Sequence, residues 1–111
     1  MIGIQQVELG EIRQIILDHA PDCQVLLFGS RARGTHAMGS DLDLAFKRKD
    51  NMKLGLERIS RLKHEFDESD LPYRVDVLDY WSVTPDFRKI IESGAIDFST
   101  FSEINELCAL K

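Results

Sequence analysis

Residues 23–28 form a short, almost unbroken apolar run (CQVLLF), and this run constrains the fold more than any other segment. Pro21 lies just before the run and Gly29 ends it. An apolar run of this length between two such residues indicates a buried strand. The chain has 111 residues, which is enough for one domain with one core. We therefore expect a single domain over residues 1–111, built on a sheet that contains this strand.

The other elements are predicted from the periodicity of the apolar residues, which is helical in some segments and alternating in others. The predicted strands are residues 23–28, 41–46, 73–79 and a short edge strand at 95–98. The predicted helices are residues 9–20, 52–66, 85–93 and 100–110, with a loop or short helix over residues 29–40. This order predicts an α/β (α+β) domain with a small mixed sheet flanked by helices.

Polar residues at the ends of the predicted helices agree with this assignment. Asp50 or Asn51 is the expected N-cap of the second long helix. Thr84 is followed by a proline, a pair that is typical of a helix start. Thr100 and Glu103 have the spacing of a capping box and predict the start of the last helix.

The overall composition is that of a globular protein and limits the function classes. Hydrophobic residues make up 43% and charged residues 30%, which argues against disorder. The net charge of −5 is opposite in sign to that of a protein that coats nucleic acid, so no direct nucleic-acid binding is expected. The chain has neither a run of roughly 18 apolar residues nor a basic leader, so we expect a cytoplasmic protein without membrane contact. Cys23 and Cys108 are expected to be reduced thiols, and the histidines lack zinc-binding spacing.

The segment after the first strand has the composition of a phosphate-binding turn. Gly29 lets the backbone approach a ligand closely, and Ser30 offers a hydroxyl and an N–H group. Arg31 and Arg33 add positive charge at the same place, and a guanidinium group matches the geometry of a phosphate. Each of these residues taken singly is ordinary turn or surface material. Together they predict a cradle for a nucleoside triphosphate.

Asp41 and Asp43 lie two residues apart in the second predicted strand, so their carboxylates project from one face while the intervening leucine points to the core. Two like charges side by side are unfavourable unless a cation lies between them, and carboxylates completed by phosphates and water suit Mg²⁺. Asp76, flanked by valines in the third strand, is the natural third carboxylate of a two-metal site. Asp79 is the competitor, although an acidic residue at a strand end is ordinary in turns. We expect the three aspartates to share one face of the sheet.

The residues GSRARGTHAMGSDLDL, followed later by RVDVLD, resemble the signature of the minimal nucleotidyltransferases of the DNA polymerase beta-like superfamily. The resemblance covers about residues 8–98 and implies a nucleotidyltransferase-like core. The stretch ESDLPYRVDVLDYWSVTPDFRKII is also similar to small bacterial members that are paired with a HEPN-domain protein in MNT–HEPN toxin–antitoxin systems. The segment from Thr100 onward lies outside the resemblance.

The resemblance also implies roles for individual residues. The implied nucleotide-binding residues are Gly29, Ser30, Arg33 and Ser40. The implied catalytic and metal-binding residues are Asp41, Asp43 and Asp76. In the implied mechanism the first two aspartates hold Mg²⁺ on the phosphates of ATP, while the third binds a second Mg²⁺ and helps to deprotonate the acceptor. The implied reaction transfers AMP from ATP to a tyrosine hydroxyl of a HEPN partner, which silences that partner as a toxin.

Two other functions stay open at this stage. A binding module could sequester a toxin by contact alone, with or without a nucleotide, although such a module has no need of three placed aspartates. A transferase that modifies a small molecule such as an aminoglycoside would have a similar core. Those enzymes usually carry an extra domain or longer insertions, for which 111 residues leave little room. The same size argument favours an acceptor that arrives on another chain.

Overall fold

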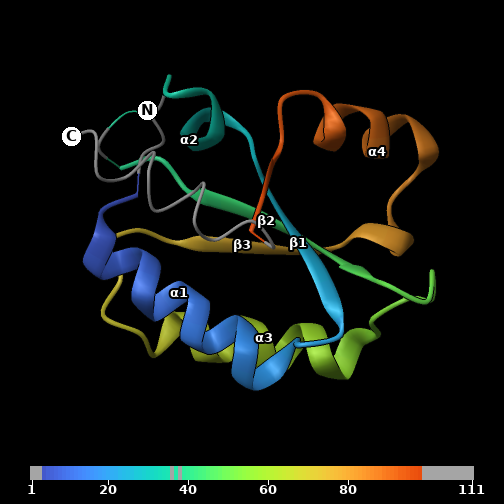
Figure 1. Ribbon diagram of the computed structural model, residues 1–111, viewed down its shortest axis with the longest axis horizontal. Coiled ribbons are helices and arrows are strands. Elements are labelled where there is room, and N and C mark those ends of the chain that lie inside the picture. The colour runs from blue at the N-terminus through green and yellow to red at the C-terminus, as the bar shows by residue number, and fades with distance from the viewer. Residues whose placement is uncertain (1–3, 36, 38, 99–111) are drawn as a thin grey trace.

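A four-stranded mixed sheet lies between two pairs of helices in the computed structural model, which describes residues 4–35, 37 and 39–98 (Figure 1). The elements in chain order are α1 (Gln6–His19), β1 (Cys23–Phe28), α2 (Ser30–Arg33), β2 (Leu42–Arg48), α3 (Leu56–Asp67), β3 (Val75–Asp79), the short 3₁₀ helix η1 (Tyr80–Ser82), α4 (Pro85–Glu92) and β4 (Ile96–Asp97). The predicted fold class, the four predicted strands and the first three predicted long helices are confirmed. The helix predicted over residues 100–110 lies outside the described residues.

The strands are arranged in the order β3-β2-β1-β4. β1 runs antiparallel to both β2 and β4, whereas β2 and β3 are parallel. A parallel pair needs a crossover connection, and α3 provides it on the face that α1 also covers (Figure 1). Parallel strands begin at the same edge of the sheet, and here the N–H of Leu42 donates to the carbonyl of Arg74 at 2.8 Å. The segments that lead into β2 and β3 are therefore neighbours.

The two faces of the sheet carry separate apolar clusters, because successive side chains of a strand point to opposite faces. The face under α1 and α3 buries Val25, Leu27, Leu42, Leu44, Phe46, Val75 and Val77. The face under α4 buries Leu26, Phe28 and Ala45 together with Tyr80 and Ile91. β1 contributes to both clusters, which explains its almost unbroken apolar run. The burial of both leucines of β2 confirms that the faces were assigned correctly from the sequence.

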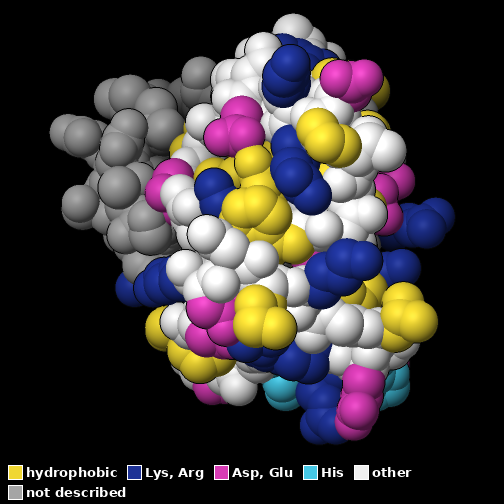
Figure 2. Space-filling view, turned by 90° about the vertical axis from the view of Figure 1, so that its right-hand side faces the viewer, with side chains coloured by type: hydrophobic (Ala, Val, Ile, Leu, Met, Phe, Trp, Pro, Cys, Tyr) yellow, Lys and Arg dark blue, Asp and Glu magenta, His cyan; other side chains and the backbone are white. Residues whose placement is uncertain are grey.

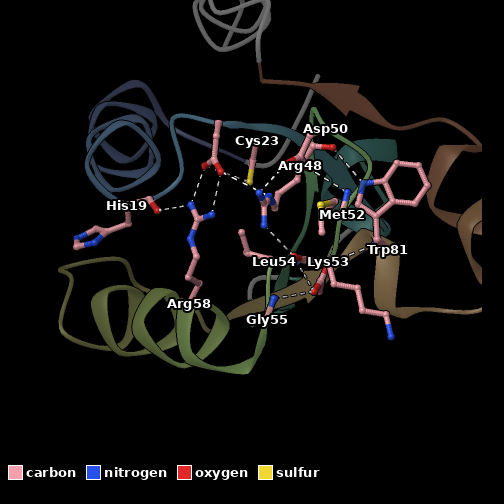
Figure 3. Close-up of polar contacts among 12 residues, drawn as sticks. His19, Cys23, Arg48, Asp50, Met52, Lys53, Leu54, Gly55, Arg58 and Trp81 are labelled. Atoms are coloured by element: carbon pink, nitrogen blue, oxygen red, sulfur yellow. Dashed lines mark hydrogen bonds and ion pairs between the residues drawn. The ribbon is translucent and has the colours of Figure 1, made fainter.

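The start of α3 was predicted wrongly, four residues too early. Met52 is 60% exposed and lies before the helix, and Asn51 has a φ of 63° instead of capping it. Gly55 is the N-cap, and its N–H donates to a carboxylate oxygen of Asp79 at 3.2 Å (Figure 3). The N–H of Leu54 donates to the same oxygen at 2.8 Å. A residue of β3 thus fixes the backbone just before α3, a contact between distant segments that helical periodicity does not contain.

An ion-pair network ties α3 to the loop that precedes β1. Arg58 donates to the two carboxylate oxygens of Asp22 at 2.7 and 2.9 Å and to the carbonyl of His19 at 3.1 Å (Figure 3). The hydrogen bond from Arg58 is the main cause that lowers the pKa of Asp22 from 3.8 to about 2. Next to this network, Cys23 is a free, buried thiol, as expected, and burial raises its pKa to about 12. Cys108 lies outside the described residues.

The surface at the right-hand end of Figure 1 carries a mixture of side chains. In Figure 2, Lys and Arg side chains lie among acidic and hydrophobic ones, so this face is not uniformly acidic despite the net charge of −5. α4 contributes to the exposed apolar surface through Phe87 and Ile90, which are 38% and 63% exposed. Within the described part of the chain, no helix is both long enough and apolar enough to cross a membrane.

Candidate active site

The register of the parallel strands places two of the predicted aspartates side by side. Asp43 of β2 pairs with Asp76 of β3, and on its other side Asp43 pairs with Phe28 at the end of β1. Asp43 alternates with Leu42 and Leu44, both of which are fully buried on the opposite face. The two aspartates therefore lie on the face of the sheet that α4 covers, as predicted.

The carboxyl group of Asp43 is in an environment that disfavours its charge. Its pKa is raised first by burial, then by the negative charge of Asp76, and then by that of Asp41. The positive charge of Arg33 acts in the opposite direction. These four residues come from three separate segments of the chain, which are α2, the start of β2 and β3. Asp41 is exposed at the entrance to β2, whereas the other two aspartates are half-buried. The three predicted carboxylates thus share one local electrostatic field.

Gly29 makes the close approach of this carboxylate possible. Its φ of +78° is in the region that favours glycine. A Cβ atom at this position would collide with Oδ2 of Asp43. The sequence predicted that Gly29 would let the backbone approach a ligand. In the structure, the absence of a side chain at Gly29 lets the backbone lie close to the carboxylate of Asp43.

The short helix α2 begins directly after this glycine and sends its two arginines in different directions. Arg33 is exposed, and its positive charge acts on the carboxyl group of Asp43. An exposed position is the one expected for a residue that would meet phosphates. Arg31 differs from the expectation, because only 4% of it is exposed. Its Nε donates to the carbonyl of Ser40 at 3.0 Å. Ser30, at the first position of the helix, is half-buried beside the glycine.

Ser40 closes the turn that leads into β2. Its hydroxyl oxygen accepts a hydrogen bond from the N–H of Ala37 at 2.9 Å, and its own N–H donates to the carbonyl of Ala37 at 3.1 Å. These bonds hold the backbone immediately before Asp41. The side chain of Ser40 is thus used locally, and its contribution to the site in the structure is to fix this backbone.

Asp79, the competing third carboxylate, has a structural role. It is buried on the α1 and α3 face of the sheet, with 8% of its surface exposed. Besides the two N–H groups before α3, it accepts hydrogen bonds from the N–H of Trp81 at 3.2 Å and from the hydroxyl of Ser82 at 3.0 Å. A carboxylate with four donors is stabilised without a cation. Asp76 is therefore the carboxylate of β3 that is placed for the site.

The aspartates fit a metal that completes its coordination with substrate. Among the described residues, no three Asp, Glu, His or Cys side chains are grouped closely enough to hold an ion by themselves. Mg²⁺ is typically bound by one or two carboxylates together with phosphate oxygens and water. Two carboxylates in register, of which Asp43 has a pKa raised by burial and by the charge of Asp76, are a donor set of this kind.

Sequence reasoning missed the surroundings of Arg31. The guanidinium carbon of Arg31 lies 4.0 Å from the centre of the Tyr73 ring, and the hydroxyl of Tyr73 donates to Oε1 of Glu8 at 2.9 Å. An arginine next to a glycine–serine pair suggests an exposed phosphate ligand, and no local signal in the sequence marks it as buried.

Solved structures of toxin–antitoxin complexes have the same mixed α/β fold as this chain. A toxin–antitoxin complex with AMP-PNP matches with a TM-score of 0.70 at 23% identity, over 92% of this chain and 81% of the other. An MntA–HepT toxin–antitoxin structure matches with a TM-score of 0.58 at 21% identity, over 96% of this chain and 81% of the other. These similarities concern the fold.

The chain belongs to the nucleotidyltransferase domain family, whose model matches residues 9–106. It is 43% identical to the probable protein adenylyltransferase MntA of Haemophilus influenzae over 90 residues, which is 81% of this chain and 77% of that protein. The nucleotidyltransferase class implied by the sequence resemblance is therefore confirmed.

Proposed function

We propose that this chain transfers AMP from ATP to a tyrosine hydroxyl of a HEPN-type partner protein and so acts as the antitoxin of a toxin–antitoxin pair. The observation that carries the proposal is the pairing of Asp43 with Asp76 on adjacent parallel strands, directly beside the Gly29 backbone. The 43% identity to a probable protein adenylyltransferase supports a protein as the acceptor. The toxin–antitoxin structures with the same fold agree with a hetero-oligomer.

In this proposal Asp41, Asp43 and Asp76 hold two Mg²⁺ ions. When bound, Mg²⁺ neutralises the charge on the phosphates and on the departing pyrophosphate. Burial and then the charges of Asp76 and Asp41 raise the pKa of Asp43, and the cations would relieve the part that is due to repulsion. Gly29 and Ser30 would meet the triphosphate, Ser40 would hold the backbone beside it through its bonds to Ala37, and Arg33 would add positive charge at the exposed side.

The reaction transfers the AMP group from an oxygen of pyrophosphate to the oxygen of the acceptor hydroxyl. The acceptor hydroxyl attacks the α-phosphorus of ATP, and its proton passes to the carboxylate of Asp76. The bond from the α-phosphorus to the bridging oxygen breaks, and pyrophosphate leaves. AMP remains as an ester on the partner. The reaction takes place in the cytoplasm, and direct binding of nucleic acid is not part of it.

Intact-mass spectrometry of the partner tests the proposal. The partner, taken from the neighbouring gene, is incubated with ATP, Mg²⁺ and either the wild-type chain, Asp43→Asn or the control Asp86→Asn. Asp86 is an exposed residue in the first turn of α4. We expect a gain of one or more AMP units with the wild type and the control and none with Asp43→Asn. A stable complex of the two chains without any mass gain would contradict the proposal and favour a steric antitoxin.

A further inference from the structure

The buried guanidinium of Arg31 is an unusual feature next to a site that needs exposed positive charge. Only Arg31 and Asp79 are buried polar or charged residues among those described. Taking a charge out of water is unfavourable unless close contacts compensate for it. Asp79 is explained by its four hydrogen-bond donors. The contacts of Arg31 should therefore show what its burial achieves.

Arg31 connects the three segments that form the site. It belongs to α2, which begins directly after Gly29. Its Nε–H donates to the carbonyl of Ser40, the residue before Asp41, at 3.0 Å. Its guanidinium lies 4.0 Å from the ring of Tyr73, which leads into the strand of Asp76.

The ring that receives the guanidinium is itself held from outside the site. The hydroxyl of Tyr73 donates to Glu8 of α1 at 2.9 Å, and the same glutamate oxygen accepts the N–H of Gln5 at 3.0 Å. Next to the ring, the carbonyl of Arg74 accepts the N–H of Leu42 at 2.8 Å. The ring therefore cannot shift without disturbing the start of α1 or the start of the parallel strand pair.

We infer that Arg31 is a positioning residue, which sets the distance between the triphosphate-binding turn and the carboxylate of Asp41 through the Ser40 carbonyl and the Tyr73 ring. The inference rests on the proposed nucleotide and metal site. With so little of its surface exposed, Arg31 acts through its neighbours, in contrast to the exposed Arg33. A planar guanidinium combines a directed N–H bond with stacking on a ring, which a lysine ammonium does not reproduce.

The test measures binding of a non-hydrolysable ATP analogue by calorimetry over a series of Mg²⁺ concentrations. For Arg31→Lys we expect the Mg²⁺ concentration for half-maximal nucleotide binding to rise about tenfold, as for other residues that orient metal ligands. At saturating Mg²⁺ the binding should return to within about twofold of the wild type. Arg74→Lys, the same change at an exposed neighbour of Tyr73, should leave the Mg²⁺ dependence unchanged.

A merely structural role predicts a different pattern. In that case Arg31→Lys would reduce the fraction of binding-competent protein, seen as a lower stoichiometry and melting temperature, at an unchanged Mg²⁺ dependence. That pattern would overturn the inference. If Arg31→Lys fails to fold, Tyr73→Leu and Tyr73→Phe decide the question. A shift in Mg²⁺ dependence with Tyr73→Leu, which removes the ring, and none with Tyr73→Phe, which keeps it, supports the inference. Equal behaviour of the two overturns it.

The same experiment separates this inference from the proposed function. A wild-type chain that binds the nucleotide with Mg²⁺ but does not modify its partner overturns the proposed transfer and leaves the positioning role of Arg31 measurable. A wild-type chain that binds no nucleotide at any Mg²⁺ concentration overturns both.

Discussion

Neutralising Asp43 should stabilise the unliganded protein. Asp43 and Asp76 pair on parallel strands, which lie about 4.8 Å apart. Two unit charges at that distance repel by about 3 kcal/mol at an effective dielectric constant of about 20. Both side chains are half-buried, so solvent and salt reduce this to about 1 kcal/mol. For Asp43→Asn, which keeps the shape, we expect the free energy of unfolding to rise by that amount, and the melting temperature by about 4 °C.

The pH dependence of the stability tests independently whether the charged form of Asp43 destabilises the fold. The pKa of Asp43 is raised above its ordinary value of 3.8, so between these two values the folded state binds more protons than the unfolded state. The stability of the wild type therefore falls as the pH rises through this window, and Asp43→Asn lacks this loss. Thermal unfolding followed by circular dichroism, with a chelator present, should show nearly equal stabilities at the acid end and the largest gap at neutral pH.

A matched control separates local repulsion from net charge. Asp86→Asn changes the net charge in the same way, from −5 to −4, at an exposed position in the first turn of α4. A carboxylate there interacts favourably with the helix dipole, so the control should lose about 0.3–1 kcal/mol. With Mg²⁺ and an ATP analogue at about 100 times Kd, the wild type should gain about 2.7 kcal/mol and overtake Asp43→Asn. An Asp43→Asn chain that is less stable than the wild type at neutral pH without ligand would refute the reasoning.

Further predictions concern four single positions. Gly29→Ala should lose about 1–3 kcal/mol of stability and nucleotide binding, because its Cβ meets the neighbouring carboxylate at a positive φ. Gly10→Ala, whose new Cβ would meet no atom within 4 Å outside its own helix, should gain about 0.5–1 kcal/mol, and urea titration of both glycine variants measures these differences. Asp79→Ala should lose about 2–3 kcal/mol by leaving buried N–H groups unpaired, yet its folded fraction should bind nucleotide normally in calorimetry, unlike a change at a metal ligand. The pKa of Asp22 is lowered to about 2 by Arg58, so the stabilisation by this carboxylate is complete above pH 3.8 and is lost as the pH falls through 2. Since Asp22 is 45% exposed, Asp22→Asn should cost about 1 kcal/mol at pH 7 and progressively less as the pH falls through 2, and a constant difference in acid unfolding curves would contradict the assignment.

The strands could be predicted from the sequence because each strand carries its own burial pattern. β1 is apolar on both faces and is covered on both, whereas β2 alternates and places Asp43 opposite its buried leucines. The order of the strands could not be predicted in this way, since it depends on which edges meet. The alternation within each strand, which the sequence shows, predicts the face on which Asp43 and Asp76 lie. Their pairing also depends on the parallel register of β2 and β3, which no local pattern shows.

The errors arose where a distant residue determines the local structure. The apolar stripe from Met52 onward predicted a longer α3, but the carboxylate of Asp79 binds the backbone before Leu56 and delays the helix. Arg31 was expected beside Arg33 on the surface, because a sequence does not show that the ring of Tyr73, from a distant segment of the chain, will cover it. In both cases the local structure is determined by a side chain from β3 or from the segment before it.

The two aspartates of β3 show how the fold divides one residue type between chemistry and structure. Asp76 and Asp79 are three residues apart, and because three is odd, a strand turns their side chains to opposite faces. On the face that α4 covers, burial and then the charge of Asp76 raise the pKa of Asp43, and a bound cation would relieve this repulsion. On the other face Asp79 meets the N–H groups before α3 and in η1, which resolve its charge within the protein. The carboxylate without such donors on its face is the one available to a metal. A sequence in which the spacing were even would place both on one face, and the start of α3 would then compete with the substrate for the same carboxylates.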